Sequence, residues 1–316
     1  MRQKLLTALH QILTTTIANR RFYFSRLVGF RSEIALRAYL AHKGEEPLDG
    51  GQFLFPHTGM DTCGHELVYV TVSGRDKSSY TDLYATLASI PIVKRLYFVS
   101  YSHMSTWQHR IFRAKDADNS HVDILIPAPC FRYHVFDCGS FQNCDEASVL
   151  DHFEKKTRVS YASQKQNTLG YLSQYPASAI ESVYANRFFL DVSLGEYKKG
   201  MIDCDGVLKR SGQYWLLESK EKDVGGSNDA GYFGWDSRRF AWYLYLQNCC
   251  SLKTLYIIRQ VNNQTERRFV DWRYVDIEGF ASWASWLSES GGGGGSGTIT
   301  APLAAFSRLS SLFGEN

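Results

Sequence analysis

The 316-residue sequence lacks the residue spacings that mark several common catalytic and metal sites. None of its seven cysteines belongs to a C-x-x-C pair, so the usual zinc-ribbon arrangement is absent. The chain also has no G-x-x-x-x-G-K-[ST] loop, no H-E-x-x-H pair and no G-x-S-x-G turn. These absences argue against a P-loop ATPase, a zincin protease and an α/β-hydrolase.

Long apolar runs are missing as well. No stretch approaches the roughly 18 uninterrupted apolar residues of a membrane span. The start of the chain has no apolar signal-peptide core, and an odd number of cysteines in a long chain argues against a disulfide framework. We therefore expect no contact with a membrane and a reducing, cytoplasmic environment.

The composition is that of a folded protein. Apolar residues make up 44% and charged residues 21% of the chain, which is enough to bury a core. The net charge is only +3, but the residues before Gly44 include just one acid, Glu33. Their basic residues can meet phosphates or form a solvated face: Arg2, Lys4, Arg20, Arg21, Arg26, Arg31, Arg37 and Lys43.

The length suits two domains. By the usual length of a domain, residues 1–145 are expected to form a separate α/β domain for recognition or partner binding, with helices and β-branched strands within it. Residues 146–290 predict a second domain with the order helix, three strands, helix, strand. Its expected helices are 176–186 and 238–248, with a Trp-rich helix at 277–287. Its expected strands are 188–192, 201–209, 213–220 and 252–261.

The two strands 201–209 and 213–220 predict a hairpin, with Gly212 supplying a positive φ in the turn. Side chains alternate along a strand, so Glu218 shares one face with Lys220, and Asp203 shares one with Asp205. A hairpin brings residues of its two strands to about 5 Å from one another. Carboxylates gathered in this way repel unless a cation lies between them, and Mg²⁺ is commonly held by one or two carboxylates.

The stretch from Asp205 to Lys220 resembles the signature of the PD-(D/E)XK nuclease superfamily, in which an aspartate precedes Glu-x-Lys by about a dozen residues. Within that superfamily it is most similar to the RecB-type nucleases, which have Asp-x-Val, a turn with glycine, an aromatic pair, two apolar residues and then (Asp/Glu)-x-Lys. The chain departs from them on the following helix, where Tyr243 fits their Gln-x-x-x-Tyr but Arg239 replaces the glutamine. The resemblance implies an α/β fold with a restriction-endonuclease-like αβββαβ core.

The resemblance also implies roles for individual residues. Asp205 and Glu218 would bind Mg²⁺ or Mn²⁺, with the carbonyl of Ser219 as a third protein ligand. Lys220 would hold or deprotonate the attacking water. The acidic residue on the helix before the sheet would be Glu181.

Other residues are auxiliary candidates in this interpretation. Asp203 is an alternative or additional metal ligand, because a Gly-x-Ile-Asp lead-in would place the aspartate there. Arg239, Tyr243 and Lys222 are candidate nucleic-acid contacts, or they pack the sheet and a loop onto the core.

The function expected from these residues is a metal-dependent DNA endonuclease within a multi-protein machine for DNA processing, genome defence or transposition. Two alternatives stay open. One is a non-catalytic nucleic-acid clamp or interaction scaffold with a nuclease fold, and the other is an RNA nuclease, because the backbone chemistry is the same.

The last residues form a separate element. Residues 291–297 read GGGGGSG, which behaves as flexible coil and is typical of an engineered linker. Residues 298–316 follow it, with apolar residues at helical spacing: Leu303, Phe306, Leu309 and Phe313. We expect a tethered partner peptide that docks on the main body as an amphipathic helix in a groove, with a disordered native tail as the alternative.

Overall fold

The computed structural model describes residues 2–16, 20–55, 66–115, 121–150, 169–194, 200–226, 231–288 and 297–314. The chain has mixed α/β structure and forms two compact units. Unit 1 comprises Met1–Arg31 and Gly51–Asp203, and unit 2 comprises Ser32–Gly50 and Cys204–Asn316. No helix among the described residues is long and apolar enough to cross a membrane.

The units are divided at 31/32, 50/51 and 203/204, whereas chain length led us to place a single boundary at 145/146. Long-range strand pairing accounts for the difference. Strand β1 (Leu48–Asp49) pairs with β10 (Gly206–Arg210), and β2 (Gly51–Phe55) pairs with β9 (Gly200–Asp203). Each unit is therefore assembled from segments that are distant in sequence. The usual length of a domain cannot predict such an arrangement.

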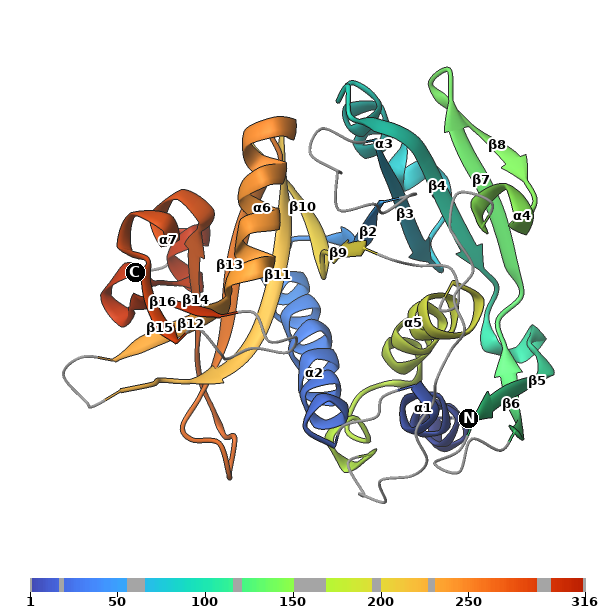
Figure 1. The fold of residues 1–316 in the computed structure, drawn as a ribbon, viewed down its shortest axis with the longest axis horizontal. Coiled ribbons are helices and arrows are strands. Elements are labelled where there is room, and N and C mark those ends of the chain that lie inside the picture. The colour runs from blue at the N-terminus through green and yellow to red at the C-terminus, as the bar shows by residue number, and fades with distance from the viewer. Residues whose placement is uncertain are drawn as a thin grey trace. The chain divides into compact units, whose positions relative to one another are not determined.

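Unit 1 contains a six-stranded sheet with the order β8-β7-β4-β3-β2-β9. Strands β3 and β4 are parallel and are joined through α3, as Figure 1 shows. The remaining strand pairs of the sheet are antiparallel. The further elements are α1 (Arg2–Thr16), the first part of α2 (Arg20–His42), β3 (Leu67–Ser73), α3 (Thr81–Ala88), β4 (Val93–Tyr101), the hairpin β5 (Gln108–Lys115) and β6 (His121–Ala128), β7 (Phe131–Asp137), β8 (Ser140–Cys144), α4 (Glu146–Leu150) and α5 (Ala177–Phe188).

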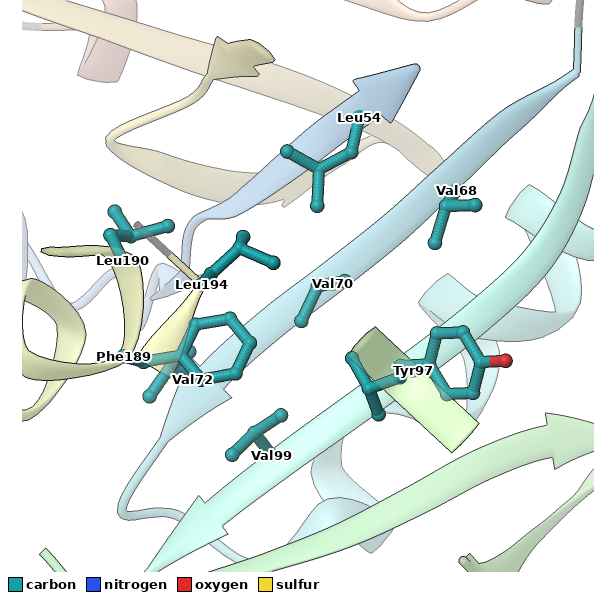
Figure 2. Packing of buried hydrophobic residues seen from close by; sticks show 10 residues of the cluster. Leu54, Val68, Val70, Val72, Tyr97, Val99, Phe189, Leu190 and Leu194 are labelled. Carbon is teal, nitrogen blue, oxygen red and sulfur yellow. The ribbon is translucent and has the colours of Figure 1, made fainter. Parts of the chain in front are cut away.

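The core of unit 1 lies on the β3 strand, all of whose residues are buried. Figure 2 shows Val70 and Val72 on this strand facing Phe189 and Leu190. The expected strand at 188–192 is wrong, because Phe189–Ser193 forms a π-helical turn that continues α5. A short apolar run is equally compatible with a buried strand and with the buried end of a helix. Here the run forms the end of a helix that packs against β3.

Unit 2 contains a six-stranded sheet with the order β1-β10-β11-β13-β14-β17 and a three-stranded sheet with the order β12-β16-β15. In the first sheet, β11 and β13 are parallel and the other pairs are antiparallel. The additional elements are β11 (Gln213–Asp223), β12 (Tyr232–Asp236), α6 (Ser237–Cys250), β13 (Lys253–Val261), β14 (Phe269–Asp276), α7 (Ile277–Trp283), β15 (Ser285–Ser288), β16 (Thr298–Pro302) and β17 (Ser307–Arg308). The Trp-rich helix therefore ends at Trp283, and the chain continues as β15.

The predicted β10–β11 hairpin is confirmed. Gly206 pairs with Leu217, and the turn residues Ser211 and Gly212 have φ angles of 49° and 75°. Two consecutive positive φ values match the twist of a two-residue hairpin. The expected single strand 201–209 is instead interrupted: residues up to Asp203 belong to β9 in unit 1, and β10 starts at Gly206.

Helices cover both faces of the large sheet of unit 2. Leu36 and Leu40 of α2 pack in one cluster with Leu217 of β11, whereas Tyr243 of α6 contacts Glu218. Neighbouring residues of a strand point to opposite faces. The unit 2 part of α2 and helix α6 therefore lie on opposite faces, and α6 runs beside β13 (Figure 1).

The tail docks on unit 2 but not as an α-helix, so the expected amphipathic helix is wrong. It forms the strands β16 and β17 with short 3₁₀ turns at Leu303–Ala305 and Leu309–Phe313. The tail supplies backbone hydrogen bonds to two sheets, and this pairing overrides the weak helical preference of so short a segment.

Candidate active site

Glu218 lies at the centre of a cluster of polar side chains in unit 2. Its side chain is completely buried on β11, yet three groups contact its carboxylate. The hydroxyl of Tyr243 donates to Oε2 at 2.8 Å, Arg239 Nη1 donates to Oε1 at 3.1 Å, and Lys220 Nζ lies 2.6 Å from Oε1. A buried carboxylate is tolerated only when it is paired and hydrogen-bonded in this way.

Helix α6 presents two of these groups because of how it begins. Asp236 caps the helix, and its Oδ1 accepts the backbone N–H of Arg239 at 3.1 Å. Arg239 and Tyr243 are four residues apart and therefore lie on one face, one turn from each other. Tyr243 is fully buried, and the side chain of Arg239 is about one-third exposed.

Lys220 is two residues beyond Glu218 and lies on the same face of β11. Its ammonium also lies 3.2 Å from the carbonyl oxygen of Ser219, and its side chain is 31% exposed. The predicted pairing of Glu218 and Lys220 on one strand face is therefore confirmed. Solvent can reach the side chains of Lys220 and Arg239, whereas Glu218 and Tyr243 are fully buried.

Asp205 lies just before β10, beside the same stretch of β11. Its backbone N–H donates to the carbonyl of Leu217 at 2.8 Å, and its Oδ2 accepts the backbone N–H of Ser219 at 2.7 Å. The aspartate carboxylate is thus fixed to the backbone of the strand that carries Glu218 and Lys220. The three residues expected at the centre of the site therefore lie in the β10–β11 hairpin or directly before it.

Helix α2 supports this arrangement from the other face of the sheet. The hydroxyl of Ser32 lies 2.6 Å from that of Ser219, and both serines are fully buried. Arg37 donates to the backbone carbonyl of Asp205 at 3.3 Å and forms an ion pair with the buried Asp49. No sequence pattern predicts the Ser32 contact, and Arg37 is predicted only as one of the basic residues before Gly44.

Lys222 continues the face that carries Glu218 and Lys220. Burial and, to a smaller extent, the nearby ammonium of Lys220 lower the pKa of Lys222 to about 8. The carboxylates of Asp223, Glu218 and Asp236 act in the opposite direction. Lys222 therefore loses its proton more easily than an exposed lysine does.

Two expected site residues belong to unit 1 instead. Glu181 is on α5, where its Oε1 accepts the backbone N–H of Met104 at 2.8 Å and its Oε2 lies 3.7 Å from Nε2 of His103. Asp203 is on β9, opposite Gln52 of β2, and forms a 3.9 Å ion pair with Arg26. Both residues belong to unit 1, whereas Asp205, Glu218 and Lys220 belong to unit 2.

No group of three or more histidine, cysteine, aspartate or glutamate side chains with the potential to hold a metal ion occurs in the described part of the chain. The candidate oxygen donors in and beside the hairpin are the carboxylates of Asp205 and Glu218 and the carbonyl of Ser219. This donor set fits a hard divalent cation that completes its coordination with water and substrate oxygens. It does not fit zinc, which prefers nitrogen and sulfur.

Comparisons with protein-family models, curated proteins and solved structures found no match to this chain.

Proposed function

We propose that unit 2 is a metal-dependent nuclease domain of the PD-(D/E)XK type that hydrolyses phosphodiester bonds in DNA. The observation that carries the proposal is the hairpin cluster, in which Asp205 is bonded to the backbone of Ser219 and Lys220 lies 2.6 Å from Glu218. Structural ion pairs on strands are usually exposed, whereas Glu218 is completely buried. A buried carboxylate beside a partly exposed lysine is typical of a catalytic site.

The order of elements in unit 2 supports the same proposal. The second part of α2 is followed by β1, β10, β11, α6 and β13, with β12 lying in the other sheet between β11 and α6. This is the helix, strand, strand, strand, helix, strand order of the restriction-endonuclease-like core. The proposed core thus begins at residue 32, and residues 51–203 are an insertion into it.

The insertion changes the candidate for the acidic residue on the helix before the sheet. That helix is α2, and the acidic residue in its unit 2 part is Glu33. Glu33 directly follows Ser32, whose hydroxyl contacts Ser219 of the hairpin. We propose Glu33 for this role in place of Glu181, which belongs to unit 1.

In the proposed reaction, Asp205, Glu218 and the carbonyl of Ser219 would hold Mg²⁺ or Mn²⁺. When bound, the ion would supply a water of lowered pKa and neutralise charge at the phosphate. Lys220 positions the attacking water through its ammonium and stabilises the negative charge that develops on the phosphate oxygens. Arg239 holds the Glu218 carboxylate, and its exposed part is available to a phosphate.

In the same proposal, residues 298–316 are a peptide of a partner protein, tethered by the Gly/Ser run.

The test is a cleavage assay on plasmid, linear duplex, single-stranded DNA and RNA with Mg²⁺ or Mn²⁺. We expect Lys220→Ala to lower DNA cleavage by roughly 100-fold or more. The matched control is Lys209→Ala, because Lys209 is an exposed lysine on the partner strand β10. Equal cleavage by the Lys220→Ala and unmodified proteins would overturn the proposal. Binding without cleavage in either metal would indicate a clamp, and cleavage of RNA alone would indicate an RNA nuclease.

A further inference from the structure

The segment from Gly297 to Phe313 is bound to unit 2 mainly through strand pairing. Strand β16 is the central strand of its sheet, between β12 and β15. Ile299 pairs with Trp235 on one side and Trp286 on the other, and Ala301 pairs with Phe233. A peptide that adds a strand in this way gains affinity from the main chain and specificity from pockets for its side chains.

Two side chains of the segment, Phe306 and Leu309, are buried on opposite faces of the large sheet. The Phe306 ring is 5.0 Å from that of Phe233 and 6.2 Å from that of Tyr256. Leu309 is fully buried in the cluster that contains Leu217. Between them, β17 pairs with the edge strand β14, and Arg308 lies 3.3 Å from a carboxylate oxygen of Asp271. The segment therefore passes around the edge of the sheet and holds both faces.

The bound segment also adjoins the start of α6. The carbonyl of Gly297 accepts the backbone N–H of Ser237, the first residue of that helix, at 3.0 Å. Trp235 of β12 stacks on Tyr256 with a 3.9 Å separation between ring centroids and lies 5.7 Å from the ring of Tyr243. Strand β12 thus links the segment to the helix that presents Arg239 and Tyr243 to Glu218.

We infer that unit 2 carries an exchangeable strand-addition site for an extended peptide of a second protein, with the pattern Thr-Ile-Thr-Ala-Pro-Leu-x-x-Phe-x-Arg-Leu. The occupant present in the structure follows a glycine and serine run in the sequence, a composition typical of a flexible linker. Occupancy fixes β12 and the first turn of α6, and so holds Arg239 and Tyr243 on Glu218. The effect on Arg239 and Tyr243 matters for catalysis only if the proposed nuclease function is correct. Binding of the peptide does not depend on that function.

The experiment replaces residues 291–296 in the full chain with a protease recognition sequence of equal length. After cleavage, a fluorescently labelled peptide of residues 297–316 is added and its polarisation is followed. We expect saturable exchange with the cleaved tail and competition by unlabelled peptide. A Phe306→Ala peptide should bind at least roughly tenfold more weakly, whereas a peptide with Ser307→Ala, at an exposed position, should bind normally.

A compensating pair of variants tests the register of the strand. A Cβ atom at Gly234 would lie 2.9 Å from Cγ2 of Thr298, so Gly234→Ala should weaken binding of the unmodified peptide. A Thr298→Ala peptide lacks that methyl group and should recover affinity for the Gly234→Ala protein. Failure of the labelled peptide to exchange, or release of the cleaved tail only when unit 2 unfolds, would overturn the inference.

Hydrogen exchange tests the link to α6. Removal of the cleaved peptide should speed exchange of the amides at 237–243 by roughly tenfold or more, while the amides of β13 stay protected. Unchanged exchange in α6 would overturn the link. Because both readouts measure binding and protection, they remain informative if the cleavage assay shows that the nuclease proposal is wrong.

Discussion

The hydroxyl of Tyr243 donates a hydrogen bond of 2.8 Å to the carboxylate of Glu218, and both side chains are completely buried. Tyr243 is on α6 and Glu218 is on β11, so this contact joins the helix to the strand within unit 2. Its energetic effect is expected to be larger than that of a surface contact, because the acceptor is charged and no water can replace the donor.

Tyr243→Phe should destabilise the protein by about 1.5–3 kcal/mol, the range for a hydrogen bond to a charged group. Urea denaturation measures this, as a lower midpoint with an unchanged slope. Tyr245→Phe is the matched control, since Tyr245 is on the same helix but only partly buried. A similar loss in both variants would mean that the contact with Glu218 has no special effect.

The Ser32–Ser219 pair predicts a coupling between α2 and the hairpin. Each single change to alanine leaves one fully buried hydroxyl without its partner and should cost about 1–3 kcal/mol. Ser32→Ala combined with Ser219→Ala removes both groups and should cost less than the sum of the single changes. Additive losses in the double-mutant cycle would contradict a direct interaction.

The hairpin was predictable because its signals are local. The turn at Ser211 and Gly212 and the alternation through Glu218 and Lys220 are both encoded within 20 or so consecutive residues. The helix that carries Arg239 and Tyr243 follows soon after. These neighbours in sequence are also neighbours in the folded site.

The rest of the site was not predictable in this way. Ser32 lies 187 positions before Ser219, and no periodicity connects two segments at that distance. Asp203 and Asp205 have the same local pattern, yet one belongs to β9 in unit 1 and the other lies before β10 in unit 2. The pairing of β1 with β10 decides this division, and strand pairing depends on the whole fold.

The close packing of backbone around Gly50 predicts that only glycine is tolerated at this position beside the candidate site. A Cβ atom there would lie 1.9 Å from the carbonyl oxygen of Cys204 and 2.8 Å from the carbonyl carbon of Asp205. Because these are backbone atoms, Gly50→Ala should displace Asp205 and destabilise unit 2 by roughly 3 kcal/mol or more. Thermal and urea unfolding measure the loss. Gly170→Ala is the control, since a Cβ atom there meets nothing within 4 Å, and an equal loss in both variants would contradict this explanation.

The lowered pKa of Lys222 predicts that the free energy of unfolding changes with pH in the alkaline range. Burial lowers its pKa to about 8 in the folded protein, below the ordinary lysine value of 10.5. Below pH 8 the lysine is charged in both states, and the folded state carries the full cost of the buried charge. Between about pH 8 and 10.5 the unfolded state binds more protons than the folded state, so the contribution of Lys222 to stability should rise with pH, by at most about 1.4 kcal/mol per unit.

Lys222→Met removes this titration, so its advantage over the unmodified protein should be greatest at pH 7 and should shrink towards pH 10.5. Urea denaturation across this range measures the difference, with Lys209→Met, at an exposed position of β10, as the control. A parallel pH dependence in the two variants would show that loss of one positive charge, and not burial of Lys222, is responsible.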